Sequence, residues 1–157
     1  MNAVLSEWDG EFGLPPFAAI KDEDFGPAFE AALAEARGNI AAIAGAQEVP
    51  SFANVIEAME LAEGLLDRVS GLFYNLAGAD STAAREALQR DLAPKLSAFS
   101  SEVTNNKTLF GKIEALWERR DALGLTAEQA RARSAAAAPA RSRARARSPS
   151  AAGCAAI

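Results

Sequence analysis

The sequence contains no histidine and only one cysteine, Cys154. Without histidine the chain lacks the commonest general base, the imidazole of Ser-His and Cys-His catalytic pairs, and the usual nitrogen ligand of zinc. A single cysteine cannot form a disulfide within the chain, so nothing indicates an oxidising compartment. We therefore expect no catalysis by this chain alone, and we assign it no catalytic, cofactor-binding or metal-binding residue.

Long apolar runs are also missing. No stretch approaches the roughly 18 consecutive apolar residues that a membrane-spanning helix needs. The first residues, MNAVLSEWDGEF, lack the basic region followed by an apolar one that marks a secretory signal. These features predict a soluble, cytoplasmic protein that does not enter a membrane.

Acidic residues are absent from the last part of the chain. Residues 1–131 hold all 21 acidic side chains against 11 Lys and Arg, a net charge of −10, whereas residues 132–157 hold five Arg and no acid. The second segment is mostly Ala, Arg and Ser, and its one large aliphatic side chain is Ile157. We therefore divide the chain into a helical domain, 1–131, and a disordered low-complexity tail, 132–157.

Within the helical domain, apolar side chains recur every three or four residues and predict an amphipathic helical fold. A first helix should open at Pro27, which suits a first helical turn, and end near Gly45. A second should open at Ser51, a favourable cap, and carry an apolar stripe for about seven turns before the turn GADS at 78–81.

Two further helices and the start of a fifth are predicted downstream. The third helix should kink at Pro94, because proline removes a backbone donor and clashes with the preceding turn. Asn-Asn at 105–106 should separate it from the fourth helix, which ends before Gly124. The pattern T-x-x-Q at 126–129 is a capping box, yet no amphipathic stretch follows it.

Residues 8–26 precede these helices and form what we call the N-terminal strap. Its glycines and prolines disfavour regular structure. Its large apolar side chains are predicted to dock on the helices as anchors for the core: Trp8, Phe12, Leu14, Phe17, Ile20 and Phe25.

The predicted fold class is all-α: an antiparallel bundle of four principal helices, with neighbours joined by short turns, an extended N-terminal strap and a disordered C-terminal tail. Each buried core side chain should contribute about 1.5–3 kcal/mol before the entropy cost is subtracted. The predicted core comprises Phe29, Leu33, Ile40, Ile43, Phe52, Val55, Met59, Leu66, Val69, Phe73, Leu76, Leu88, Leu92, Leu96, Phe99, Ile113, Leu116 and Trp117.

Four carboxylates on the second helix resemble a metal site at first sight. Glu57, Glu60, Glu63 and Asp67 are three or four residues apart, as in carboxylate-bridged metal sites of helical bundles. At about 100° per residue, however, they centre on the side opposite the apolar stripe. We interpret them as a solvated helix face.

Five segments, taken in order, resemble the N-terminal helical region of one enzyme family. They are GEFGLPPFAAIKDEDFGPAFEAALAE, PSFANVIEAMELAEGLLDRVSGLFYNLAGADS, LAPKLSAFSSEV, NKTLFGKIEALWERRDALGL and TAEQAR. The family is that of thimet oligopeptidase, oligopeptidase A and peptidyl-dipeptidase, which are zinc metallopeptidases. One departure is Asp24, where relatives commonly have histidine.

The resemblance implies a parent enzyme whose helical halves enclose a deep channel, so that only short peptides reach a zinc ion inside. In that family the zinc ligands are a His-Glu-x-x-His pair and a downstream Glu, and the first Glu is the general base. None of these residues is present here. We expect this segment to form one wall of the channel and to lack the catalytic centre. The sequence does not distinguish endopeptidase from dipeptidyl-carboxypeptidase activity, and it leaves the oligomeric state open.

The tail has two interpretations. Ala, Arg, Pro and Gly have GC-rich codons, so its composition is typical of a GC-rich gene read out of frame, and we favour a frameshift near codon 131. The alternative is a stand-alone helical interaction module whose Arg141, Arg143, Arg145 and Arg147 bind nucleic acid or another anionic partner. Nucleic acid is disfavoured because the tail has no aromatic side chains and the body is acidic.

Overall fold

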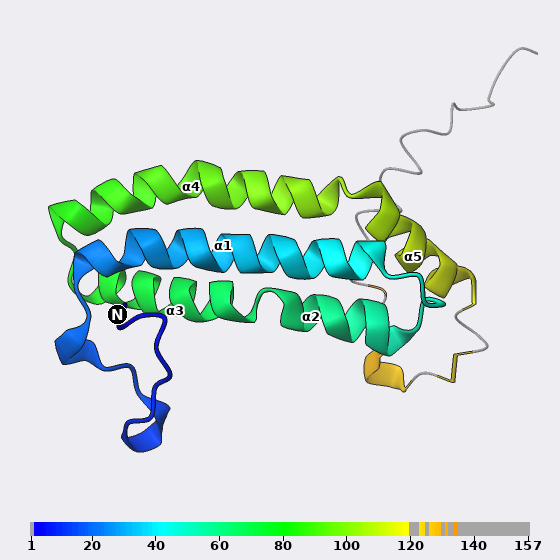
Figure 1. Cartoon of the computed structure of the whole chain (residues 1–157), viewed down its shortest axis with the longest axis horizontal. Helices are drawn as coiled ribbons and strands as arrows, with labels where there is room; N and C mark the ends of the chain where they lie inside the picture. Colours follow the sequence, from blue (N-terminus) through cyan, green and yellow to red (C-terminus); the bar gives the residue numbers. More distant parts are fainter. Residues whose placement is uncertain (1, 120–122, 125, 130, 132–133, 135–157) are drawn as a thin grey trace, which may run out of the picture.

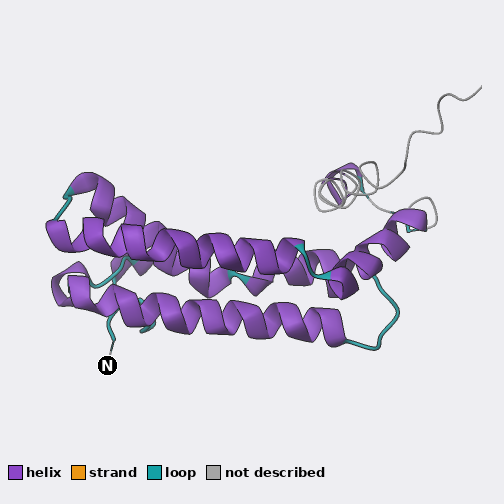
Figure 2. Cartoon of the chain, turned by 90° about the horizontal axis from the view of Figure 1, so that it is seen from above, coloured by secondary structure: helices purple, strands orange, loops and turns teal. Residues whose placement is uncertain are grey.

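The computed structural model describes residues 2–119, 123, 124, 126–129, 131 and 134 (Figure 1). The described part of the chain consists of helices joined by loops and contains no strand (Figure 2). Its elements are η1 (Glu11–Gly13), η2 (Phe17–Ala19), α1 (Asp22–Gly45), η3 (Phe52–Glu57), α2 (Ala58–Ala62), α3 (Gly64–Ala79), α4 (Ala83–Thr104) and α5 (Lys107–Glu118). The predicted all-α fold class is confirmed.

Helix α1 is the centre of the molecule. It contacts α2, α3, α4 and α5, and Figure 1 shows it between α4 and the α2–α3 pair. The chain runs out along α1, returns along α2 and α3, and runs out again along α4. The α1, α2–α3 and α4 segments are therefore antiparallel in turn, as predicted, and α1 and α4 are parallel. The predicted antiparallel arrangement does not extend to α5, which leaves the end of α4 obliquely (Figure 1) and packs against α1 and η3.

The predicted start of the first helix at Pro27 is wrong, because α1 begins at Asp22. The backbone N–H of Lys21 donates to Asp24 Oδ2 at 2.9 Å, and the acidic first turn complements the helix dipole. These interactions start the helix early enough that Pro27 lies inside it. Phe25 consequently belongs to α1, where its side chain is fully buried.

The second predicted helix is not continuous. Ser51 caps it as predicted, since its Oγ accepts from the N–H of Asn54 at 3.1 Å, but the first turns are π-helical. The helix then breaks at Glu63, whose φ of −105° and ψ of 10° are not helical. Asn39 of α1 donates its side-chain N–H to the carbonyl of Ala62 at 3.0 Å and so satisfies an acceptor at the break.

Helices α4 and α5 begin where a side chain caps the first turn. Helix α3 continues through part of the predicted turn to Ala79, and Thr82 Oγ1 then caps α4 by accepting from the N–H of Arg85 at 3.1 Å. Helix α4 continues through Pro94 to Thr104. Asn106 Oδ1 caps α5 by accepting from the N–H of Leu109 at 3.0 Å.

The end of the described region agrees with one of two local predictions. Gly124 has a φ of +58°, a left-handed conformation that favours glycine, but it does not cap the fourth predicted helix, because α5 ends at Glu118 with Arg119 as its C-cap. Thr126 and Gln129 form the predicted capping box, with reciprocal bonds of 3.1 and 3.2 Å, and residues 127–129 are helical. The predicted disordered tail, 132–157, lies outside the described residues except at Ser134.

The core consists of two clusters along α1. The larger cluster joins the first half of α1 to α3 and α4. At its centre is Phe73, whose ring centroid lies 5.1 Å from that of Phe25 and 5.5 Å from that of Phe29. The smaller one joins the end of α1 to η3, α2 and α5. All 18 predicted core residues are buried or half-buried. The prediction missed several fully buried side chains, including Val4 and Ile56.

The predicted docking of the N-terminal strap is only partly correct. Trp8 and Ile20 pack against the larger cluster. Phe12, Leu14 and Phe17, in contrast, are 87%, 55% and 51% exposed. In Figure 1 this part of the chain, drawn in blue, extends away from the helices. The strap is therefore anchored at its two ends and exposed between them.

Candidate functional site: the seam between α1 and α4

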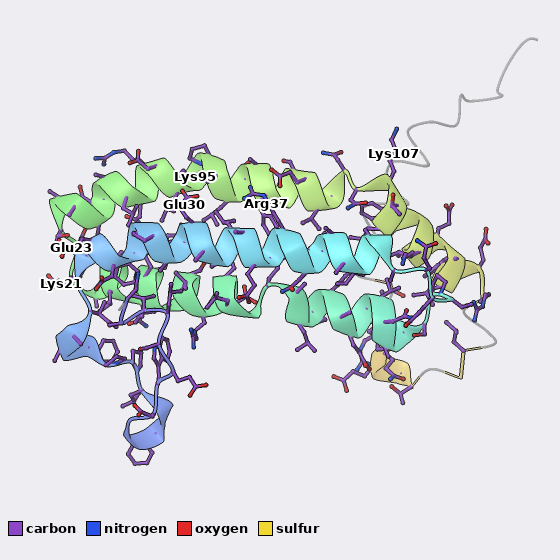
Figure 3. All side chains as sticks on the ribbon, in the orientation of Figure 1. Lys21, Glu23, Glu30, Arg37, Lys95 and Lys107 are labelled. Carbon is purple, nitrogen blue, oxygen red and sulfur yellow. The ribbon has the colours of Figure 1, made fainter. Side chains whose placement is uncertain are left out.

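Two ion pairs join α1 to α4 along their parallel seam. Arg37 Nε and Nη2 donate to the two carboxylate oxygens of Glu102 at 2.7 and 3.3 Å. Lys95 donates to Glu30 in a second pair, and Figure 3 shows these two side chains pointing toward each other from the two helices. The seam therefore carries alternating charges, each opposite its partner.

Pairing shifts the pKa values of three of these groups toward their charged forms. The hydrogen bond from Lys95, followed by its charge, lowers the pKa of Glu30. The hydrogen bond with Arg37 lowers the pKa of Glu102, and the same bond raises the pKa of Arg37. These shifts favour the charged forms of Glu30, Glu102 and Arg37, which suits them to holding two helices in register and not to proton transfer.

A shallow depression of about 190 Å³ lies beside the Arg37–Glu102 pair. Its walls are Arg37, Ile40, Ala41, Phe99, Glu102, Val103 and Asn106. The Arg37 guanidinium lies 5.7 Å from the centre of the Phe99 ring, and Asn106 Oδ1 is already engaged in capping α5. The depression is smaller than the roughly 300–1,000 Å³ typical of ligand pockets, and its charged groups are paired with each other. It fits a single side chain better than a peptide.

A third polar cluster fixes the starts of α1 and α4 to each other. Arg85 Nε donates to Asp22 Oδ1 at 2.7 Å, and Thr82 Oγ1 donates to Asp22 Oδ2 at 3.0 Å. Arg85 Nη1 also donates to the carbonyls of Asp80 at 2.6 Å and Leu76 at 3.3 Å. The Arg85 side chain is only 15% exposed. The cluster therefore supplies hydrogen-bond donors to carbonyl groups at the end of α3 and fixes the start of α4 relative to α1.

These ion pairs were not predicted from the sequence, although a signal for them exists. Glu30 and Arg37 are seven residues apart on α1, and Lys95 and Glu102 are seven apart on α4 with the opposite order of charge. Seven residues are about two helical turns, so both pairs form at once when the two helices are parallel. The sequence alone does not reveal that α1 and α4 are parallel neighbours.

The four carboxylates considered as a metal site lie around the break between α2 and α3. Glu57, Glu60 and Asp67 are exposed, as predicted for a solvated face, while Glu63 is half-buried. Burial, followed by the charges of Asp67 and Glu60, raises the pKa of Glu63. The break at Glu63 interrupts the regular spacing on which the metal-site interpretation depended.

Zinc does not fit the residues described. Within these residues, no group of three or more His, Cys, Asp or Glu side chains is placed to hold a metal ion. The whole chain has no histidine, and its one cysteine is Cys154. Asp24 caps the start of α1 by accepting from the N–H of Lys21. We therefore assign no step of a metal-dependent reaction to the side chains that the structure describes.

Comparison with known proteins identifies relatives of the chain. It is 31% identical over 131 residues, 83% of its length, to the dipeptidyl carboxypeptidase of Escherichia coli (strain K12). It is 31% identical over 130 residues to the dipeptidyl carboxypeptidase of Salmonella typhimurium (strain LT2) and 32% identical over 100 residues to the oligopeptidase A of that strain. The chain is a relative of these peptidases. The resemblance inferred from the five sequence segments is confirmed.

The relatives are much longer than this chain. The match covers 19% of either dipeptidyl carboxypeptidase and 15% of oligopeptidase A. No protein-family model matches the chain. Among the described residues, no helix is both long and apolar enough to cross a membrane.

Proposed function

We propose that this chain is the N-terminal helical part of an oligopeptidase-type peptidase whose complete form hydrolyses short peptides in the cytoplasm. The observation that carries the proposal is the 31% identity to a dipeptidyl carboxypeptidase over 83% of the chain. The match to oligopeptidase A supports the same family, and it leaves endopeptidase and dipeptidyl-carboxypeptidase activity as equal options.

In this proposal the helices are a wall of the substrate channel. Paired charges along α1 and α4, and an Arg85–Asp22 cluster at their starts, support a rigid wall. The complete enzyme would be zinc-dependent, with the metal held by residues outside this chain, because the side chains described here do not fit zinc.

We further propose that the segment after about residue 131 is the product of a frameshift. Its composition supports this, since five Arg and no acidic residue follow a body with a net charge of −10. A capping box at 126–129 also begins a helix for which the following residues supply no apolar face.

Sequencing the gene across codon 131 and well downstream, with translation in all three frames, tests the proposal. A second frame that resumes an amphipathic helix and later encodes His-Glu-x-x-His would support it. If no frame does so in independent copies of the gene, the parent-enzyme proposal is wrong and a stand-alone module takes its place.

Activity gives an independent test. The purified, zinc-loaded chain should not cleave a quenched fluorescent oligopeptide, whereas the restored full-length product should. Metal-dependent turnover by the 157-residue chain itself, retained through size-exclusion chromatography, would refute the assignment of the catalytic groups to residues outside it.

A further inference from the structure

The middle of the N-terminal strap presents large apolar side chains to solvent. We call residues 10–19 the strap tip. Within it Phe12 is 87% exposed, Leu14 55% and Phe17 51%. Other exposed large apolar residues, such as Val49 and Leu61, are separate in sequence and belong to different elements. Isolated apolar residues on a surface are ordinary, whereas three within six residues indicate a contact surface.

The backbone at the strap tip is strained where the most exposed ring is held. Phe12 has a φ of 62° and a ψ of 15°, a left-handed conformation that is uncommon for residues other than glycine, and Gly13 follows with a φ of 65°. A strained backbone conformation of this kind persists only when interactions with surrounding groups hold the residue in it. With the Phe12 ring exposed, the chain itself provides little compensation for the strain.

The strap tip is also held in a defined shape. At its base, Trp8 packs against the larger core cluster, and the Arg68 guanidinium lies 5.1 Å from the centre of the Trp8 ring. Ile20 packs against the same cluster on the other side of the tip. Within the tip, the N–H of Gly13 donates to Gly10 O at 3.0 Å and that of Phe17 to Pro15 O at 2.8 Å. An apolar element that is ordered before binding loses less entropy on docking.

We propose that the strap tip is a docking element that inserts Phe12, Leu14 and Phe17 into an apolar pocket on the remainder of the peptidase polypeptide. This inference rests on the proposed function. The available partner is large, because the matched region makes up only 19% of a dipeptidyl carboxypeptidase. Exposed Glu7 and Asp9 lie beside the tip, so the pocket should have a basic rim.

A second copy of the chain is a poorer occupant of this surface. A symmetric dimer would place the same patch on both sides of the interface, so Glu7 and Asp9 of one copy would face those of the other. The net charge of −10 over residues 1–131 adds to this repulsion.

The substitution Phe12→Gly tests the inference because its effects in two contexts should have opposite signs. In the isolated chain, glycine relieves the left-handed strain and removes an exposed ring, so the unfolding midpoint should stay or rise. In a chimaera where residues 1–131 replace the matched region of the E. coli dipeptidyl carboxypeptidase, the docked ring is lost and the midpoint should fall. Thermal unfolding of both proteins measures this. The double substitution Val49→Ser and Leu61→Ser, at exposed positions outside the strap, is the control.

The outcomes separate this inference from the proposed function. A lower midpoint for the Phe12→Gly chimaera, with the control unchanged, supports docking. If the parent chimaera folds and cleaves peptides but strap substitutions leave its midpoint unchanged, the docking inference fails and the peptidase proposal stands. If the parent chimaera neither folds nor cleaves peptides, both fail. Concentration-dependent dimers of the 157-residue chain in light scattering, abolished by Phe12→Gly, would identify a second copy as the occupant and overturn the inference.

Discussion

Replacing Phe73 with alanine should remove a central part of the contact between α1 and α3. The Phe73 side chain is fully buried, and its ring packs edge-on against those of Phe25 and Phe29. A buried Phe→Ala change costs about 3–5 kcal/mol, including the cavity left behind. Since domains of this size are stable by only about 5–15 kcal/mol, the variant should lose a large fraction of its stability.

Urea unfolding followed by circular dichroism measures the effect. With a slope of about 1–3 kcal/mol per molar urea, a loss of 3 kcal/mol or more lowers the midpoint by at least about 1 M. Leu61→Ala is the matched control, because Leu61 is helical but 77% exposed, and its midpoint should barely change. A loss below about 1.5 kcal/mol for Phe73→Ala, at an unchanged slope, would refute the described packing of α3 against α1.

Three further predictions concern polar groups. Arg85→Met should destabilise the chain by about 1.5–3 kcal/mol by removing charge-assisted bonds to Asp22, and a double-mutant cycle with Asp22→Asn in urea should show that the two changes are not additive. Burial, followed by the charge of Asp67, raises the pKa of Glu63, so ionisation of Glu63 opposes folding. This destabilisation is absent below the pKa of Glu63 in the unfolded state, and it grows as the pH rises through the higher pKa of the folded state. Glu63→Gln should therefore raise the thermal midpoint at pH 7 and have little effect at low pH; an equal gain at both would contradict this cause. The 157-residue chain should shift neither DNA nor RNA in an electrophoretic assay at low salt more than a chain lacking 132–157 does, and a tail-dependent shift would favour the basic-arm alternative.

Helix caps were predicted correctly from the sequence where the capping partners are close together in the chain. Ser51 and the Thr126–Gln129 pair cap helices as expected, because their partners are three residues away in the chain. The start of α1 was misplaced for a related reason. Pro27 is a familiar first-turn residue, but the bond from the N–H of Lys21 to Asp24 opens the helix one turn earlier.

The break at Glu63 illustrates what a periodic pattern cannot reveal. The apolar spacing continues from Ala62 to Leu66 without interruption, so the sequence predicts one helix. The side-chain N–H of Asn39 on α1 donates a hydrogen bond to the Ala62 carbonyl, which the break leaves without a helical partner. The two residues are 23 apart in the sequence. Patterns read from one sequence, such as apolar spacing and capping motifs, relate residues only a few positions apart, so they do not reveal this hydrogen bond.

By itself the sequence determined the all-α class, the positions of most helices and the residues that form the core. It did so because helix formation and burial depend on spacings of three and four residues and on adjacent caps. Only the tertiary structure decided that α1 and α4 lie side by side, so that Glu30 meets Lys95 and Arg37 meets Glu102. It also decided that the strap tip exposes Phe12, because whether a side chain is buried depends on the space that the other elements leave for it.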